Sequence, residues 1–366
     1  MEFVQEAITT LHDFGTPAPS VPLDDVAVVV PIMAEDLAGH EIDHVLSTLA
    51  SVDPGRIVLC VRAPRDHVTS LGHVLERESL DANILWCNAP SLESRLEDAG
   101  IAAPAGKGRD VWLGMILAAT EHGIVVVHDA DAQSYAADLV PRMAWPIANG
   151  YGFVKGYYAR VEADQLYGRL VRLVWMPLLD ILEQDHPFVR YLGAFRYPLA
   201  GEIALRSDLV SSLQLAPRWG LETSLLGEMY DHVGPTGTAQ VDLGRHAHDH
   251  RPVTGDDGLA PMTREIVGTL MSSLEARGVD VDMARLAAEY EEVAGRYLDQ
   301  YAADAAYNGL EYDRQGEREQ IQIYGEAIAN PSDGHAPLPA FDTIEMTHQE
   351  LMAAGQLHSA ETPGSR

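Results

Sequence analysis

The chain has 366 residues, of which 46% are apolar and 22% charged, so it can bury a sizeable core and is neither disordered throughout nor fibrous. It carries 55 Asp and Glu residues against 25 Lys and Arg, which gives a formal net charge of −30 at pH 7. Phosphate backbones and anionic bilayers would repel such a charge, so we expect no nucleic-acid partner and no membrane partner.

The composition also indicates where the protein works. Only Lys107 and Lys155 are lysines, and so acidic a surface with so little lysine suggests a halophilic protein in a salt-rich cytoplasm. The two cysteines, Cys60 and Cys87, cannot form a disulfide framework, which predicts a reducing compartment. Residues 1–20 lack the pattern of a signal peptide, and no apolar stretch is long enough to span a bilayer. We therefore expect a cytoplasmic protein.

In chain order, an N-terminal segment over residues 1–24 precedes an alternation of strand-like and helix-like patterns. Short β-branched runs predict strands at residues 25–32, 56–61, 82–86 and 123–128. Helix-length patterns lie between them at residues 40–51, 66–80 and 107–122. This alternation predicts a parallel sheet in an α/β half that covers residues 25–150.

Beyond residue 150 the pattern changes. A mixed α+β half is expected over residues 151–260, with strands near 152–158, 197–205 and 238–243 and an apolar helix near 166–183. Apolar residues at three- and four-residue intervals predict a helical C-terminal extension over residues 261–329. Residues 330–366 are dotted with Pro and Gly and are predicted to form a flexible tail.

The first candidate site is the triplet Asp129-Ala130-Asp131, which directly follows the predicted strand at 123–128. In an open α/β sheet, ligands gather at the carboxyl ends of the strands. Two carboxylates two residues apart can share a divalent cation such as Mg²⁺ or Mn²⁺, which prefers oxygen ligands and can hold a diphosphate at the same time. The alternative is a solvated turn that closes the strand.

Two further segments could contact a nucleotide. Gly106-Lys107-Gly108 offers a close backbone approach and a compact cation for phosphate, although the P-loop pattern is absent and an ordinary loop is the alternative. The first strand ends in a segment that contains Pro31, Met33 and Glu35, where a carboxylate could accept hydrogen bonds from a ribose or a base. Solvation of an acidic loop would explain that carboxylate equally well.

Three weaker signals lie in the second half. Histidines alternate over residues 246–250, so His248 and its neighbours could reach a metal from an extended segment, or could be ordinary surface histidines. The pairs Gly201-Glu202 and Leu221-Glu222 place an acid at a turn or a helix start. Each acid could bind a substrate hydroxyl, or could belong to a turn with a helix cap.

Taken in order, these segments resemble the glucosyl-3-phosphoglycerate synthases and their mannosyl-3-phosphoglycerate synthase relatives, which are retaining glycosyltransferases of the GT-A fold. The resemblance covers about residues 25 to 275. It rests on an ordered set of motifs: P-I-M-A-E at 31–35, G-K-G at 106–108, D-A-D at 129–131, G-R at 168–169, P-L-A-G-E at 198–202, G-L-E at 220–222 and V-D-L-G with A-H at 241–248, followed by R-P at 251–252.

The resemblance implies a role for each matching residue. It implies a nucleotide-sugar site formed by Pro31, Met33, Glu35, Lys107, Asp129, Ala130, Gly201 and Glu202. It implies a divalent metal, Mg²⁺ or Mn²⁺, held by Asp129, Asp131 and His248, and an acceptor site formed by Gly168, Arg169 and His250. Lys107 and Glu222 are the implied catalytic residues. The implied fold is α/β, a GT-A fold with a mixed sheet and a helical C-terminal extension.

The implied reaction moves a hexose, most simply glucose, from a nucleotide sugar to 3-phosphoglycerate or a similar small anion such as glycerate. UDP-glucose, GDP-glucose and GDP-mannose are the candidate donors, and a glucosylglycerate-type product would suit a salt-rich cell as a compatible solute. Three segments depart from the family pattern, at residues 61–63, 168–171 and 246–250. A sugar-1-phosphate nucleotidylyltransferase and a non-catalytic nucleotide-sugar binder are the other classes. The helical extension is a candidate element for a homodimer.

Overall fold

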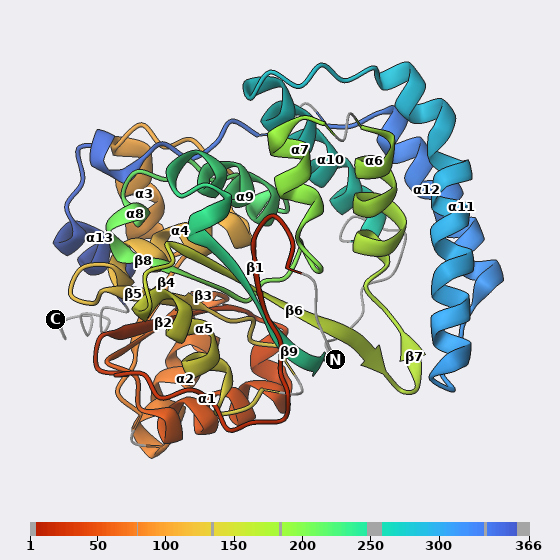
Figure 1. Ribbon diagram of the computed structural model, residues 1–366. Coiled ribbons are helices and arrows are strands. Elements are labelled where there is room, and N and C mark those ends of the chain that lie inside the picture. The colour runs from red at the N-terminus through yellow and green to blue at the C-terminus, as the bar shows by residue number, and fades with distance from the viewer. Residues whose placement is uncertain are drawn as a thin grey trace, which may run out of the picture.

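The computed structural model describes residues 5–78, 80–132, 135–182, 185–246, 258–332 and 335–356. One mixed sheet runs through the molecule with helices on both faces (Figure 1). Its strands lie in the order β1 (Thr9–Leu11), β9 (Thr238–His246), β6 (Phe153–Glu162), β8 (Ile203–Arg206), β5 (Ile124–Val127), β2 (Val26–Met33), β3 (Arg56–Arg62) and β4 (Asn83–Trp86), and β7 (Gln165–Leu166) pairs with β6.

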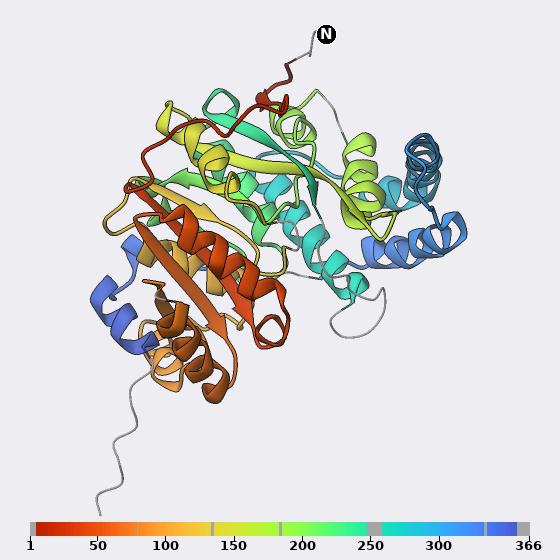
Figure 2. The same cartoon turned by 90° about the horizontal axis from the view of Figure 1, so that it is seen from below.

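Strands β5, β2, β3 and β4 are parallel, as the alternating pattern predicted. Their β-branched residues are buried on both faces because helices cover each side (Figure 2). One face packs on α1 (Glu41–Val52), α2 (Arg65–Glu78) and α5 (Leu139–Ala148). The other face packs on α3 (Pro90–Asp98) and α4 (Lys107–Ala118).

The remaining strands make the sheet mixed. Strand β8 runs antiparallel to both β5 and β6, whereas β9 is parallel to β6. The chain after β7 forms a π-helix (Val171–Trp175) that continues into α6 (Met176–Ile181), where the sequence predicted one uninterrupted helix. This half also contains α7 (Pro187–Gly193), α8 (Ser207–Val210) and α9 (Leu221–His232).

The helical extension consists of α10 (Leu259–Ala276), α11 (Met283–Tyr307) and α12 (Arg314–Ala329). It packs on its own chain: α10 contacts α9, and α11 contacts both α6 and the π-helix. The buried hydroxyl of Tyr290 on α11 donates a hydrogen bond to the Leu173 carbonyl at 2.6 Å. The extension therefore covers the half of the molecule that carries residues 151–246.

Both ends of the chain contain regular structure that the sequence pattern did not show. The N-terminal segment contains β1, which pairs in parallel with β9. The tail predicted to be flexible contains a 3-10 turn (Phe341–Thr343) and α13 (His348–Gly355), which packs on α3, α4 and β4. Its apolar anchors, such as Leu338 and Leu351, are buried but too irregularly spaced to show a period in the sequence.

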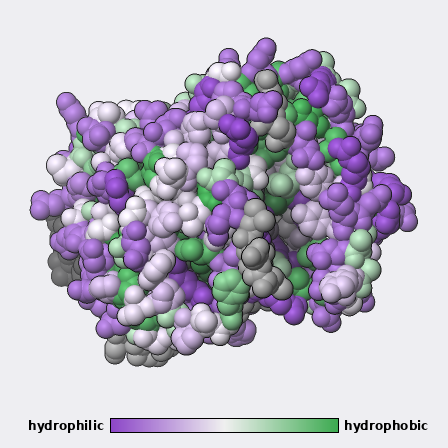
Figure 3. All heavy atoms as spheres, in the orientation of Figure 1, coloured by the Kyte–Doolittle hydropathy of each residue, from purple (hydrophilic) through white to green (hydrophobic). Residues whose placement is uncertain are grey.

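The surface agrees with the composition. The face seen in Figure 3 is mostly hydrophilic, and its apolar residues form small separate groups. Among the described helices, none combines the length and the apolarity needed to cross a bilayer.

Candidate active site

A cavity of about 230 Å³ lies at the carboxyl ends of β2 and β5, where an open α/β sheet places its ligands. It gathers predicted residues from distant parts of the sequence: Pro31, Met33, Lys107, Asp129, Ala130, Asp131, Gly168, Arg169, Gly201 and Glu222. Donor-side and acceptor-side residues therefore share one cavity.

Lys107 stands at the centre of the polar part of this cavity. It is the first residue of α4, and its Nζ lies 2.8 Å from Asp129 Oδ1 and 3.2 Å from Glu222 Oε1. Burial lowers the pKa of Lys107, but the carboxylates of Asp129 and Glu222 together raise it well above its usual value. The ammonium group is therefore charged at any physiological pH. The start of α4 packs closely on residue 216: a Cβ on Gly108 would lie 2.0 Å from the Ala216 carbonyl oxygen, so only glycine fits at this position.

A third carboxylate lies beside the predicted acid pair. Asp36, in a 3-10 turn (Asp36–Ala38), accepts a hydrogen bond from the Met33 N–H at 2.6 Å and lines the cavity. Burial, together with the carboxylates of Asp131 and Asp129, raises the pKa of Asp36 to about 6 against the lowering effect of that hydrogen bond. The predicted residue, Glu35, is exposed and does not line the cavity, because the turn directs it to solvent and Asp36 inward.

The chemistry of Asp129 and Asp131 fits a divalent cation. Both line the cavity, both offer oxygen atoms, and Mg²⁺ sites commonly use one or two carboxylates together with substrate phosphates. The neighbouring carboxylate of Asp36 adds to the negative charge that a cation would neutralise there. Within the described residues, no three His, Cys, Asp or Glu side chains are arranged to hold a metal ion. The predicted third ligand, His248, and the predicted acceptor residue His250 lie outside the described residues.

The other lysine of the chain lies directly behind the site. Lys155, on β6, is fully buried, and its Nζ donates a hydrogen bond to the Ala200 carbonyl at 2.7 Å. Burial lowers the pKa of Lys155 to about 8, against the opposing effect of Glu222 and Glu202. The scarcity of lysine was a usable signal for this residue too, because both lysines of the chain lie at or directly behind the same cavity.

The loop beside Lys155 corrects one prediction and supports another. Glu202 was expected to contact the nucleotide sugar, but it is only 1% exposed and does not line the cavity. Its backbone carbonyl accepts the Gly156 N–H at 2.9 Å, so it belongs to the layer beneath the site. Gly201 does line the cavity, and a Cβ there would lie 2.2 Å from Asp129 Oδ2. Only glycine leaves room for that carboxylate.

The acceptor side is built from β6 and the turn after β7. Gly168 has a φ of +81°, and a Cβ there would lie 3.1 Å from the Tyr197 hydroxyl. Arg169 follows it into the cavity and donates a hydrogen bond from Nη1 to Gln320 Oε1 at 3.3 Å. Arg160, which sequence reasoning missed, also lines the cavity and brings a second guanidinium to it. Its place on the same face of β6 as Tyr158 was the available signal.

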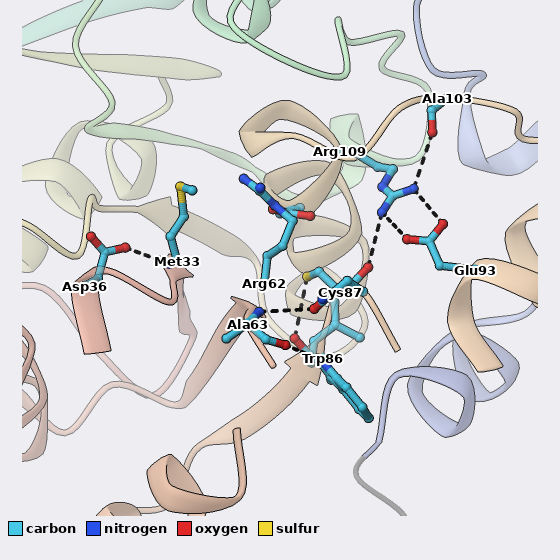
Figure 4. A network of polar contacts seen from close by, with 12 residues as sticks. Met33, Asp36, Arg62, Ala63, Trp86, Cys87, Glu93, Ala103 and Arg109 are labelled. Carbon is cyan, nitrogen blue, oxygen red and sulfur yellow. Dashed lines mark hydrogen bonds and ion pairs between the residues drawn. The ribbon is translucent and has the colours of Figure 1, made fainter. Parts of the chain in front are cut away.

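The segment after β3, one of the three that depart from the family pattern in the sequence, lies beside the cavity. Arg62 ends β3, lines the cavity and donates from Nε to Asp110 Oδ2 at 2.7 Å. The turn that follows is fixed by Asn88 Oδ1, which accepts from the Ala63 N–H at 3.1 Å, and by Trp86 Nε1, which donates to the Ala63 carbonyl at 2.9 Å (Figure 4). A guanidinium therefore faces the cavity at the end of β3.

Comparison with known proteins points to one family. No family model matches the chain. Glucosyl-3-phosphoglycerate synthase of Methanococcoides burtonii is 30% identical over 370 residues, which cover 93% of this chain and 91% of the relative. The enzyme of the same name from Persephonella marina is 30% identical over 83% of this chain and 80% of its own length.

Solved structures agree. Glucosyl-3-phosphoglycerate synthase from Mycobacterium tuberculosis in complex with Mn²⁺, UDP-glucose and phosphoglyceric acid matches with a TM-score of 0.57 and 26% identity, over 75% of this chain and 89% of that one. The same enzyme in complex with Mg²⁺ and UDP matches with a TM-score of 0.55 and 27% identity, over 75% of this chain and 88% of that one.

The mixed sheet and the polar cavity at its carboxyl ends define a glycosyltransferase of the GT-A fold. With 30% identity over nearly the whole length of a relative, the chain belongs to the glucosyl-3-phosphoglycerate synthase family.

Proposed function

We propose that this protein transfers glucose from UDP-glucose to 3-phosphoglycerate with retention at the anomeric carbon, and that Asp129 and Asp131 hold the Mg²⁺ or Mn²⁺ that assists the reaction. The observation that carries the proposal is that Lys107 and the acid pair open into the same cavity as Arg169. A donor diphosphate and an anionic acceptor would meet there.

Each side chain has a physical task in this proposal. A bound cation supplies positive charge to the diphosphate as it leaves. Lys107 adds a fixed ammonium charge, held in position by Asp129 and Glu222, and so stabilises the same negative charge. Arg169 binds the phosphate or carboxylate of the acceptor.

The bond changes follow from this placement. The bond between the anomeric carbon and the diphosphate breaks, and a bond to the acceptor hydroxyl forms on the same face of the sugar. The hydroxyl proton passes to an oxygen of the leaving diphosphate. In this scheme the protein supplies position and charge, and Glu222 acts by holding Lys107 beside the reacting centre.

GDP-glucose and GDP-mannose are the alternative donors, and glycerate is the alternative acceptor. A homodimer is a separate prediction. Arg62 lines the cavity, and we expect its guanidinium to influence which nucleotide base the donor carries. The test is an activity screen that crosses UDP-glucose, GDP-glucose and GDP-mannose with 3-phosphoglycerate and glycerate, with and without Mg²⁺ or Mn²⁺. We expect the fastest transfer with UDP-glucose and 3-phosphoglycerate. Light scattering measures the oligomeric state.

A further inference from the structure

The helical extension reaches the acceptor side of the cavity. Gln320, a half-buried residue of α12, accepts a hydrogen bond from Arg169 Nη1 at 3.3 Å through its side-chain oxygen. The same oxygen accepts from the buried Tyr324 hydroxyl at 3.4 Å. Two donors from different elements therefore converge on one amide oxygen, which fixes its direction.

A buried ion pair holds α12 against this part of the chain. The Arg172 guanidinium contacts both carboxylate oxygens of Glu317 on α12, at 2.5 and 3.0 Å, and the two side chains are 4% and 6% exposed. The Tyr312 hydroxyl also donates to Glu317. Two planar, bidentate groups in a buried site allow little freedom, so the position of α12 is well defined.

The same guanidinium fixes the turn that carries the acceptor arginine. Arg172 Nε donates to the Tyr167 carbonyl at 2.9 Å, and the Arg172 N–H donates to the Gly168 carbonyl at 3.1 Å. Arg172 also belongs to the π-helix, a form that often marks functional positions. Through its backbone N–H and its guanidinium, Arg172 thus contacts both the turn at residues 167–168 and the helix α12.

We propose that Gln320 is a positioning and specificity residue of the acceptor site, which acts from behind the cavity through its hydrogen bond with Arg169. Its amide oxygen orients the Arg169 guanidinium without placing a negative charge beside the anionic group of the acceptor. The inference rests on the proposed function, because it assumes that Arg169 binds 3-phosphoglycerate.

The choice of an amide rather than an acid makes the proposal testable. A carboxylate at position 320 would keep the shape and the hydrogen bond but would pair with Arg169 as an ion. It would then compete with the acceptor anion for the guanidinium. A merely structural residue would tolerate that isosteric change.

The experiment compares Gln320→Glu with Gln322→Glu, which adds the same charge at an exposed position of the same helix. Steady-state kinetics with UDP-glucose, 3-phosphoglycerate and Mn²⁺ give KM for each substrate, and thermal melting reports the fold. We expect the KM for 3-phosphoglycerate to rise by about tenfold or more in Gln320→Glu, since a charge-assisted hydrogen bond is lost to competition. The KM for UDP-glucose and the melting temperature should stay near the wild-type values, as should all parameters of Gln322→Glu.

A second variant keeps the inference testable if Gln320→Glu does not fold. Gln320→Leu removes the hydrogen bond without adding a charge, and we expect a smaller rise of a few fold in the same KM. An unchanged KM for 3-phosphoglycerate in the folded Gln320 variants would overturn the inference and leave the proposed function intact. Absence of transfer to 3-phosphoglycerate by the wild-type protein would overturn the proposed function, and the inference with it.

Discussion

Replacing Lys107 by methionine should separate cation binding from donor turnover. Lys107 Nζ lies 2.8 Å from Asp129, a proposed metal ligand, and 3.2 Å from Glu222. In the proposed mechanism its ammonium group stabilises the leaving diphosphate. Loss of a preoriented charged donor beside a developing negative charge costs about 3–4 kcal/mol. That corresponds to a fall of roughly 10²–10³-fold in kcat/KM for the sugar nucleotide.

The same substitution should not weaken the affinity for the metal ion and could increase it. Two unit charges about 4 Å apart interact by about 4 kcal/mol at an effective dielectric constant of about 20, so Lys107 repels a cation at Asp129. Without donor present, Lys107→Met should therefore bind Mn²⁺ at least as tightly as the wild-type protein.

Two assays measure the two effects. Steady-state kinetics give kcat/KM for UDP-glucose, and electron paramagnetic resonance of free Mn²⁺ gives the metal affinity. Arg206→Met is a matched control, because it removes an exposed cation whose residue pairs with Ile124, at the opposite end of β5 from the site. The reasoning is refuted if Lys107→Met loses Mn²⁺ binding while keeping its melting temperature, since the lysine would then be needed to build the metal site.

The remaining predictions concern the layer around the site. Gly201→Ala should abolish transfer while preserving the fold, because its Cβ would lie 2.2 Å from Asp129 Oδ2; kinetics and circular dichroism check this, and full activity would contradict it. Burial lowers the pKa of Lys155 to about 8, below its usual 10.5, so the folded state is penalised at pH below 8 and relieved as the pH rises to 10.5. Between pH 8 and 10.5, the free energy of unfolding of the wild-type protein relative to Lys155→Met, measured by urea titration, should rise by up to about 3 kcal/mol. The same pH dependence of stability in both proteins would contradict this prediction. Arg172→Met should lower the free energy of unfolding by about 3–5 kcal/mol, because it leaves the buried Glu317 carboxylate without its partner. The double variant Arg172→Met with Glu317→Leu should recover most of that loss. Equal losses of stability in the single and double variants, measured in denaturant melts, would exclude a paired role.

Much of the donor side could be predicted from sequence because its signals are local. The β-branched runs of β2 and β5 predicted buried parallel strands, and strand ends predicted where Asp129 and Asp131 meet. The pattern named Glu35, but a 3-10 turn that has no signal in the sequence decides which of two adjacent acids faces the cavity, and Asp36 is the one that lines it. A role for Glu35 stays a prediction. Glu202 follows Gly201 immediately before β8 and is buried beneath the cavity, so its burial could not be foreseen from the local sequence either.

The acceptor side depends on packing that has no local signal. Gln320 meets Arg169 across 151 positions of sequence, and a neutral amide on an amphipathic helix looks like any solvated residue. The sequence gives no signal for the ion pair of Arg172 and Glu317 either, because each residue has the pattern of an exposed surface charge and only helix packing buries it. The roles of His248 and His250 stay predictions, because both lie outside the described residues.

The central claim is that a cation on Asp129 and Asp131 assists glucose transfer to 3-phosphoglycerate. The most direct measurement follows radiolabelled glucose from UDP-glucose into an anionic product, with the metal removed by chelation and then restored, in the wild-type protein and in Asp131→Asn. We predict product with Mn²⁺ or Mg²⁺, none after chelation, full recovery when the metal returns, and at most a trace in a folded Asp131→Asn variant. Transfer at the wild-type rate by chelated protein, or by Asp131→Asn, would contradict the claim.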